Sequence, residues 1–206
     1  MRPLCCKNPV NHAIIESGMT WKSKGSLLVA LSAAAVTLIA LTSSRAESKP
    51  PLRTVDSVDL NRYAGRWYEI ARYPNRFQKK CSADTSAIYS LRNDGRIEVV
   101  NSCRKQDGEF TSSRGTAKVV DRKTNAKLKV TFFWPFSGNY WIIGLDPEYR
   151  YAIVGEPSRK YLWILSRTPE LNEALYNNAI RQIDAAGYDP SKLMLTRQSG
   201  ALRPTG

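Results

Sequence analysis

Apolar and polar residues alternate with a period of two along most of residues 66–166, and short turns rich in glycine, proline and asparagine interrupt the alternation at regular intervals. This pattern is typical of antiparallel β-strands joined by hairpins, and Asn93-Asp94-Gly95 is the clearest hairpin signal. Eight strands in up-and-down order remove their unpaired edges most simply by closing on themselves. The predicted fold is therefore all-β, an eight-stranded antiparallel up-and-down β-barrel. The strands are expected at residues 66–73, 83–91, 96–103, 110–120, 126–133, 140–145, 151–155 and 161–166.

The spacing of apolar residues changes after the eighth strand. Thr168 followed by Pro169 predicts the start of a helix, and Gly187 predicts its end. We expect this single C-terminal α-helix to pack its apolar stripe on the outside of the barrel. Residues 193–196 are candidates for a short ninth strand. The apolar residues of the stripe recur at helical spacing: Leu171, Leu175, Ala179, Ile180 and Ile183.

The first 46 residues have the pattern of a secretory signal peptide. A basic segment at 20–24 precedes an apolar run at 27–41, and Ser44-Arg45-Ala46 has the small-x-small form of a cleavage site. The apolar run is shorter than the roughly 20 residues that cross a membrane, although an uncleaved anchor remains an alternative. Residues 1–18 lack the pattern, which leaves Met19 as an alternative start. After this leader we expect a flexible tail at 47–57, one domain at 58–198 and a disordered tail at 199–206.

The positions of the cysteines and of the histidine limit which catalytic and metal sites the mature chain can form. Cys81 and Cys103 flank the predicted hairpin, so a disulfide is expected in an exported protein, with two unpaired thiols as the alternative. The only histidine, His12, lies in the leader, so the mature chain lacks an imidazole for Ser-His-Asp or Cys-His catalysis and for the usual zinc or haem sites. No cofactor or metal is expected. No cysteine lies near the end of the apolar run, so we expect a periplasmic or secreted protein without a lipid anchor, with association to the outer membrane left open.

The chain is basic, with 31 Lys and Arg against 18 Asp and Glu and a formal net charge of +13. Removing residues 1–46 leaves 26 basic and 17 acidic residues, a net charge of +9. The two signs are interspersed and no basic-aromatic module is visible, so nucleic acid is not an expected partner. For an exported protein, the excess positive charge favours peripheral contact with anionic membrane surfaces or lipid head groups.

Three separated segments carry a resemblance to a known family. They are Gly65-Arg66-Trp67-Tyr68-Glu69-Ile70-Ala71, Leu145-Asp146-Pro147-Glu148-Tyr149-Arg150-Tyr151-Ala152-Ile153-Val154 and Tyr161-Leu162-Trp163-Ile164-Leu165-Ser166-Arg167-Thr168-Pro169. With eight strands and one trailing helix, residues 55–198 resemble a lipocalin, most closely the bacterial branch that also includes apolipoprotein D. Bacterial members of that branch often carry a lipoprotein cysteine after the leader, which this sequence lacks.

The resemblance implies a cup that is closed at one end, open at the other and able to hold a small hydrophobic ligand. It places Trp67 at the closed end with the Arg167 guanidinium stacked across its ring, both in structural roles. Gly65 is expected where the backbone passes close to the indole, and Asp146 is expected to fix a turn at the same end.

The residues that touch a ligand follow from strand alternation only in part. If Arg167 points inward, Trp163 does so too and lines the cavity. A carboxylate-bearing lipid would need a polar or cationic group near the mouth, and Arg72, Arg76, Lys79 and Lys80 are candidates. Ordinary barrel packing or an outward position is the alternative for each apolar candidate. The other wall or rim candidates are Tyr89, Phe132, Trp134, Phe136 and Trp141.

The expected function is to bind and carry or store a fatty acid or lysophospholipid in the cell envelope, in membrane biogenesis or maintenance, without chemical turnover. The oligomeric state is open between monomer and homodimer. Two alternatives remain: a lipid-modifying enzyme on the same barrel with Cys81 as thiol nucleophile, and a protein whose basic exterior acts on membranes while its cavity matters less.

Overall fold

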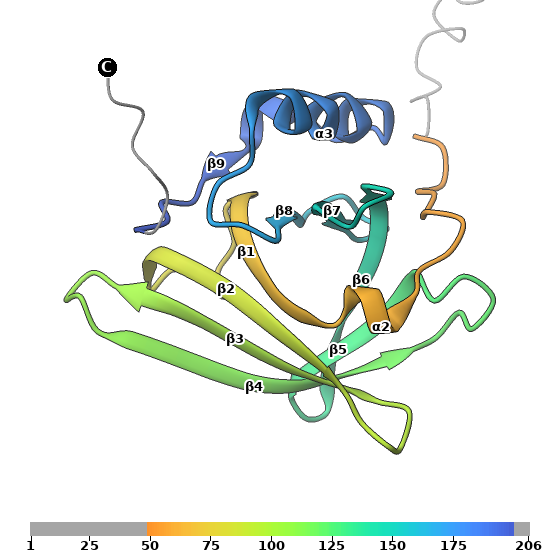
Figure 1. The fold of residues 1–206 in the computed structure, drawn as a ribbon, viewed down its shortest axis with the longest axis horizontal. Helices are drawn as coiled ribbons and strands as arrows, with labels where there is room; N and C mark the ends of the chain where they lie inside the picture. The colour runs from red at the N-terminus through yellow and green to blue at the C-terminus, as the bar shows by residue number, and fades with distance from the viewer. Residues whose placement is uncertain (1–48, 200–206) are drawn as a thin grey trace, which may run out of the picture. The chain divides into compact units, whose positions relative to one another are not determined.

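The computed structural model describes residues 49–199, so the predicted leader lies outside the described residues, as does the predicted C-terminal tail except Ser199. Eight antiparallel strands close into a barrel, because β1 pairs with both β8 and β2 (Figure 1). A ninth, two-residue strand adds to β1 beside the barrel. The predicted fold class is confirmed.

The elements follow one another with short connections. The helices are α2 (Leu60–Tyr63), α3 (Glu173–Ala185) and the 3₁₀ turn η2 (Pro190–Lys192). The strands are β1 (Gly65–Arg72), β2 (Cys81–Leu91), β3 (Ile97–Lys105), β4 (Phe110–Val119), β5 (Lys127–Phe133), β6 (Phe136–Leu145), β7 (Tyr151–Gly155), β8 (Leu162–Ser166) and β9 (Met194–Leu195).

The sixth strand begins earlier than the sequence predicted. The sequence predicted a loop at residues 134–139, because this segment contains Pro135, Gly138 and Asn139. In the structure, however, Gly138 pairs with Val130 and Asn139 pairs with Lys129, so the strand starts at Phe136. The expectation of a six-residue break is therefore wrong. The β5 backbone provides the partner that keeps these turn-forming residues extended.

The helix begins later than predicted, at Glu173. Its N-cap is Asn172, whose side-chain oxygen accepts a hydrogen bond from the Leu175 N–H at 2.9 Å. Thr168 and Pro169 lie instead in bends that lead the chain from β8 to the outer face of the barrel. The prediction that Thr168 and Pro169 begin the helix is wrong, because Asn172 satisfies the free N–H groups of the first turn.

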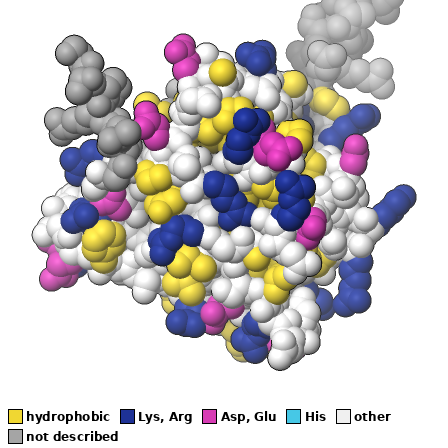
Figure 2. All heavy atoms as spheres, viewed as in Figure 1, with side chains coloured by type: hydrophobic (Ala, Val, Ile, Leu, Met, Phe, Trp, Pro, Cys, Tyr) yellow, Lys and Arg dark blue, Asp and Glu magenta, His cyan; other side chains and the backbone are white. Residues whose placement is uncertain are grey.

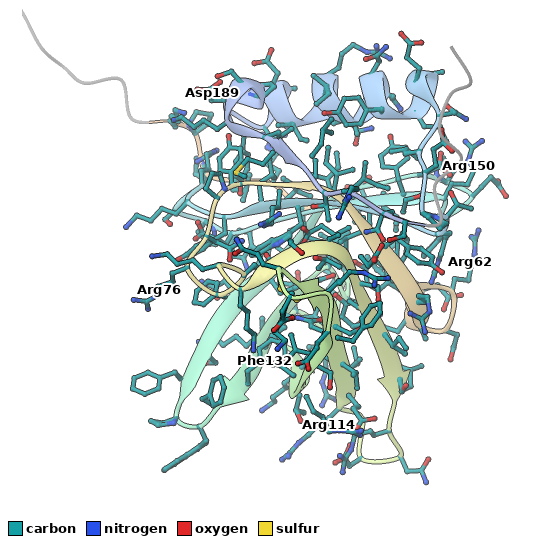
Figure 3. All side chains as sticks on the ribbon, turned by 90° about the vertical axis from the view of Figure 1, so that its left-hand side faces the viewer. Arg62, Arg76, Arg114, Phe132, Arg150 and Asp189 are labelled. Carbon is teal, nitrogen blue, oxygen red and sulfur yellow. A yellow bond between two sulfur atoms is a disulfide. The ribbon has the colours of Figure 1, made fainter. Side chains whose placement is uncertain are left out.

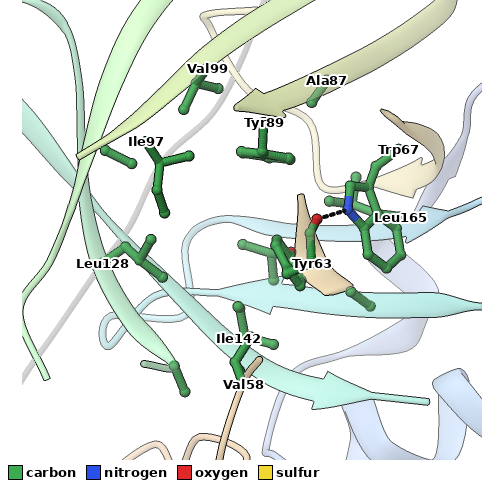
Figure 4. Packing of buried hydrophobic residues seen from close by; sticks show 14 residues of the cluster. Val58, Tyr63, Trp67, Ala87, Tyr89, Ile97, Val99, Leu128, Ile142 and Leu165 are labelled. Carbon is green, nitrogen blue, oxygen red and sulfur yellow. Dashed lines mark hydrogen bonds between the residues drawn. The ribbon is translucent and has the colours of Figure 1, made fainter. Parts of the chain in front are cut away.

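Buried apolar residues form two clusters, one on each face of the sheet. The inner cluster fills the closed half of the barrel and includes Trp67, Tyr89, Ile142 and Leu165 (Figure 4). The outer cluster joins β7 and β8 to α3 through residues such as Ile164, and α3 lies across the outside of the barrel over these strands (Figure 1). The predicted packing of the helix on the outer face is confirmed.

Candidate functional site

One end of the barrel is closed by the segment that precedes β1. Val58 is 2% exposed and packs into the inner cluster, and its N–H donates to the Thr124 carbonyl at 2.8 Å. The Asp59 side chain caps α2, accepting hydrogen bonds from the N–H groups of Asn61 and Arg62. This short capped helix carries Tyr63 across the barrel end, so the end is sealed by chain that precedes the first strand.

Trp67 and Arg167 form the centre of the closed end. The Arg167 guanidinium carbon lies 3.8 Å from the Trp67 ring centroid, and the fully buried indole N–H donates to the Tyr63 carbonyl at 2.8 Å (Figure 4). The guanidinium also donates to the carbonyls of Ala64 and Arg66 at 3.0 and 2.9 Å. Gly65 has a φ of +93°, a conformation that favours glycine. This geometry fits structural roles for all three residues.

Asp146 holds the β6–β7 turn at the same end. Its carboxylate accepts hydrogen bonds from the backbone N–H groups of Glu148 and Arg150 and from the Arg150 guanidinium at 2.7 and 2.8 Å. The guanidinium of Arg150 is the main reason that the pKa of Asp146 lies below its usual value. Asp146 therefore acts as an ionised brace of the turn.

Three tyrosine hydroxyls meet above this floor. The Tyr140 hydroxyl is 2.7 Å from that of Tyr63 and 3.0 Å from that of Tyr89. Burial raises the pKa of Tyr89 to about 12, and it also raises the pKa values of Tyr63 and Tyr140. The three phenols are therefore neutral hydrogen-bonding groups at any physiological pH.

Toward the open end of the barrel, the inward positions are only partly buried. Gly138 faces inward, since its partner Val130 packs on the inner cluster, and a Cβ added at Gly138 would meet no atom within 4 Å. Phe132 and Trp163 are also inward but only partly buried. A solvent-accessible wall inside a closed barrel is what a ligand site requires.

A β-bulge in β1 brings two charged residues into this space. Glu69 pairs with Leu165 and Arg72 pairs with Trp163, with a register shift between Glu69 and Ala71. Residues opposite each other share a face of the sheet, and Leu165 and Trp163 both belong to the inner cluster. Glu69 and Arg72 therefore both start on the interior face. Strict alternation from Trp67 would have pointed Arg72 outward, and no sequence signal marks the bulge.

Other polar side chains surround this pair. The Glu69 carboxylate accepts hydrogen bonds from the Gln78 amide, the Thr196 hydroxyl and, at 3.3 Å, the Arg72 guanidinium. Gln78 in turn accepts a hydrogen bond from the Trp163 indole N–H at 3.0 Å. Burial raises the pKa of Glu69, and its hydrogen bonds oppose that rise. Sequence reasoning singled out Arg72 as one of four cationic candidates but missed Glu69, Gln78 and Thr196.

The open end carries exposed aromatic side chains. Trp134 and Phe136 are 89% and 79% exposed at the β5–β6 tip, so they lie at the rim and not on the inner wall. Phe77, in the β1–β2 loop, contacts Tyr161 with a ring separation of 5.2 Å, and Tyr161 stacks on Trp163 at 6.1 Å. A chain of aromatic contacts thus leads from the rim to the interior.

Trp141 is not on the cavity wall. Its neighbour Ile142 belongs to the inner cluster, whereas Trp141 packs with the outer cluster and lies under the Lys127 ammonium at 4.8 Å. The expectation that Trp141 lines the cavity is wrong, because alternation along β6 places odd-numbered residues of this segment outside.

The remaining cationic candidates point into solvent. Arg76, Lys79 and Lys80 are exposed in the β1–β2 loop, and Figure 3 shows Arg76 extending away from the barrel on the side opposite Arg62 and Arg150. Figure 2 shows Lys and Arg side chains spread over the viewed face with Asp and Glu between them. On this face the two signs of charge are interspersed, as the sequence indicated.

Two surface hollows lie outside the barrel. One, of about 510 Å³, is lined by Arg150 and by residues 166–172 with Leu175, and the other, of about 410 Å³, lies over β1–β3 beside Gln198 and Ser199. Both are open and neither contains an inner-cluster residue. The barrel interior, where inward aromatic and charged side chains converge, is therefore the candidate site.

Cys81 and Cys103 form the predicted disulfide, which joins the open-end parts of β2 and β3. The enzymatic alternative that requires a free Cys81 thiol is therefore wrong. Residues 49–199 contain no group of three or more His, Cys, Asp or Glu side chains arranged to hold a metal ion. Within the same range, no helix is both long enough and apolar enough to cross a bilayer.

Comparison with known proteins agrees with this architecture. The family model described as a lipocalin-like domain matches residues 58–198. The chain is 43% identical over 159 residues to temperature-induced lipocalin-1 of Arabidopsis thaliana, covering 73% of this chain and 85% of that protein. It is 41% identical over 177 residues to the outer membrane lipoprotein Blc of Escherichia coli K12, covering 84% and 97%. Insecticyanin of the tobacco hornworm has a similar structure, with a TM-score of 0.61, 23% identity and coverage of 73% and 86%.

Proposed function

The chain belongs to the lipocalin family, and on this premise we propose that it binds a single-chain amphiphile, a fatty acid or a lysophospholipid, inside the barrel and carries it in the cell envelope without chemical turnover. The accessible inner wall at Gly138, Phe132 and Trp163 is the observation that carries the proposal. Burial of an alkyl chain against such a wall contributes about 0.8 kcal/mol per methylene group.

Two further features favour an amphiphile without turnover. The interior combines apolar walls with the Glu69–Arg72 pair, which suits a ligand with one polar end. Residues 49–199 contain no histidine, and their two cysteines are bonded to each other. The bound lipid should therefore be recovered chemically unchanged by mass spectrometry after prolonged incubation.

The proposal is tested by filling the space beside Gly138. Gly138→Phe would place a ring where an added Cβ meets no atom within 4 Å, and it should abolish binding of a fluorescent fatty acid that unlabelled fatty acids or lysolipids displace from the wild-type protein. Gly138→Ala is the matched control and should bind normally. Failure of the wild-type protein to bind any single-chain lipid, or unchanged binding by Gly138→Phe, would contradict the proposal.

We also propose that the open end contacts anionic membranes. Phe133, Trp134 and Phe136 are 76–89% exposed at one tip, and the β1–β2 loop adds exposed Arg76, Lys79 and Lys80 with no acidic residue at 74–82. Exposed aromatic rings insert at the bilayer interface, and basic side chains attract anionic lipid. Replacing Phe133, Trp134 and Phe136 by serine should reduce sedimentation with vesicles containing phosphatidylglycerol, whereas serine at Val120, which is 50% exposed at the opposite end of β4, should not.

We propose that the protein is exported by its N-terminal segment. The apolar run at 27–41 and the small-residue site at 44–46 support this proposal. N-terminal sequencing of the protein recovered from the envelope or medium of the expressing cell should begin near Glu47. Recovery of the intact N-terminus would instead favour a retained anchor.

A further inference from the structure

We infer that the Arg72 guanidinium, held inside the barrel by the bulge in β1, binds the anionic oxygen of the ligand head group, and that Glu69 weakens this binding by competing for the same guanidinium. The inference rests on the proposed function and deepens it. It concerns carboxylate and phosphate head groups alike, because both present anionic oxygens to a guanidinium.

Arg72 is only loosely engaged by the protein. Its Nη1 donates to Glu69 at 3.3 Å and to Thr196 at 3.4 Å, both long for charge-assisted hydrogen bonds. Its Nε is buried and has no hydrogen-bond partner among residues 49–199. Arg72 therefore retains hydrogen-bonding capacity on the interior side of the barrel.

Glu69, in contrast, is well satisfied by neutral donors. The Gln78 amide donates to one carboxylate oxygen and the Thr196 hydroxyl to the other, each at 2.5 Å, and the side chain is 4% exposed. These short contacts hold the carboxylate without help from Arg72. An incoming anion could therefore engage Arg72 while Glu69 keeps its own partners.

Two further buried polar atoms, one on β2 and one on β3, have no hydrogen-bond partner among residues 49–199. Thr85 is 8% exposed and its hydroxyl oxygen has no hydrogen-bond partner among residues 49–199, and neither has the buried side-chain oxygen of Asn101. The Gln198 amide donates to the carbonyls of both Glu69 and Thr85 at 2.8 Å, which places these two residues side by side. Asn101 pairs with Ala87, a member of the inner cluster, and so it faces inward.

Buried polar atoms without partners are costly, and a ligand group that supplies partners gains the corresponding free energy. The three atoms come from β1, β2 and β3, so they mark one side of the barrel interior. An acid or phosphoryl head group would supply an acceptor for the Arg72 guanidinium. The cations at the rim are less suited to bind the head group, because Arg76, Lys79 and Lys80 are exposed and water screens their charges.

The test compares an acid and an alcohol with the same alkyl chain. Dissociation constants for oleic acid, oleyl alcohol and oleoyl-lysophosphatidic acid are measured on the full chain by isothermal titration below their critical micelle concentrations. Arg72→Gln should weaken binding of both anionic ligands by about tenfold or more and change alcohol binding less than about twofold, because only the anions use the guanidinium. A loss confined to one of the two anionic ligands identifies the head group that the site accepts.

Glu69→Gln should change the affinity for anionic ligands in the opposite direction. Removing the competing carboxylate should strengthen binding of both anionic ligands several-fold and leave alcohol binding unchanged, an outcome that damage to the fold cannot produce. The double variant Glu69→Gln/Arg72→Gln removes both charges together and should bind the anions as weakly as Arg72→Gln. It replaces Arg72→Gln in the comparison if that single variant fails to fold. Arg76→Gln, a rim control, should behave as wild type.

The inference is overturned if Arg72→Gln weakens acid and alcohol equally, or if Arg76→Gln rather than Arg72→Gln selectively weakens the acids. In both cases wild-type binding of the lipids would still stand, so the proposed function would survive. If the wild-type protein binds none of the three ligands, the proposed function fails and this inference fails with it.

Discussion

The Arg167 guanidinium covers the face of the Trp67 indole at 3.8 Å, although the two residues are 100 positions apart in the chain. The same guanidinium donates hydrogen bonds to the carbonyls of Arg62, Ala64 and Arg66. Arg167 follows the last barrel strand, and these carbonyls belong to the segment that enters the first. One side chain thus links the two ends of the barrel sequence at the closed end.

We therefore expect Arg167→Ala to destabilise the protein by about 2–4 kcal/mol, because it removes the cation–π contact together with the charged donor to the carbonyls of Arg62, Ala64 and Arg66. Arg167→Lys should recover only part of the loss, since an ammonium cannot match the planar fork of donors. Urea unfolding followed by Trp fluorescence measures both. A cost below about 0.5 kcal/mol for Arg167→Ala, the level of an ordinary surface substitution, would show that this pair does not hold the closed end.

The Cys81–Cys103 disulfide closes a loop of 22 residues. In the chain-entropy model a loop of this length contributes about 3 kcal/mol, so the double variant Cys81→Ser/Cys103→Ser should unfold at correspondingly lower urea concentration. Treatment of the wild-type protein with a reductant should lower its midpoint to the same value. Reductant should have no effect on the double variant, and an effect there would point to another cause.

Tyr140→Phe should destabilise the closed half of the barrel by about 1–3 kcal/mol. The substitution removes the hydroxyl that joins Tyr63 to Tyr89 and leaves both buried hydroxyls without that partner. Tyr176→Phe on α3 is the control, because the Tyr176 hydroxyl makes no hydrogen bond within residues 49–199. Chemical unfolding of the two variants should separate them clearly, and equal stabilities would mean that the tyrosine chain adds nothing to the fold.

Asp146→Asn should cost about 1–3 kcal/mol at neutral pH, because the amide cannot replace a carboxylate that accepts from Arg150 and two backbone N–H groups. The pKa of Asp146 is lowered in the folded protein, so its contribution is present above the ordinary value of 3.8 and is lost as the pH falls through the folded pKa. The stability difference between variant and wild type should therefore shrink below about pH 4. If the stability difference between variant and wild type did not change between about pH 2 and 7, Asp146 would not stabilise the turn through its ionised form.

Much of this molecule follows from local patterns in the chain. Alternation with a period of two predicted the strands, since each strand buries one face, and the Asn93-Asp94-Gly95 turn predicted its hairpin. The change to helical spacing after Ser166 predicted the outer helix. These features depend on residues that are near one another in sequence, which is why the sequence alone determined the barrel and its helix.

What the tertiary structure decided depends on pairing between distant segments. The bulge after Glu69 exists only in the register of β1 against β8, and it turns Arg72 into the barrel against the alternation rule. The pairing of β6 with β5 kept Gly138 and Asn139 in a strand, and it left Trp141 on the outer face. Register is set by the packing of both partners at once, so no single stretch of sequence could reveal which charged side chain enters the binding space.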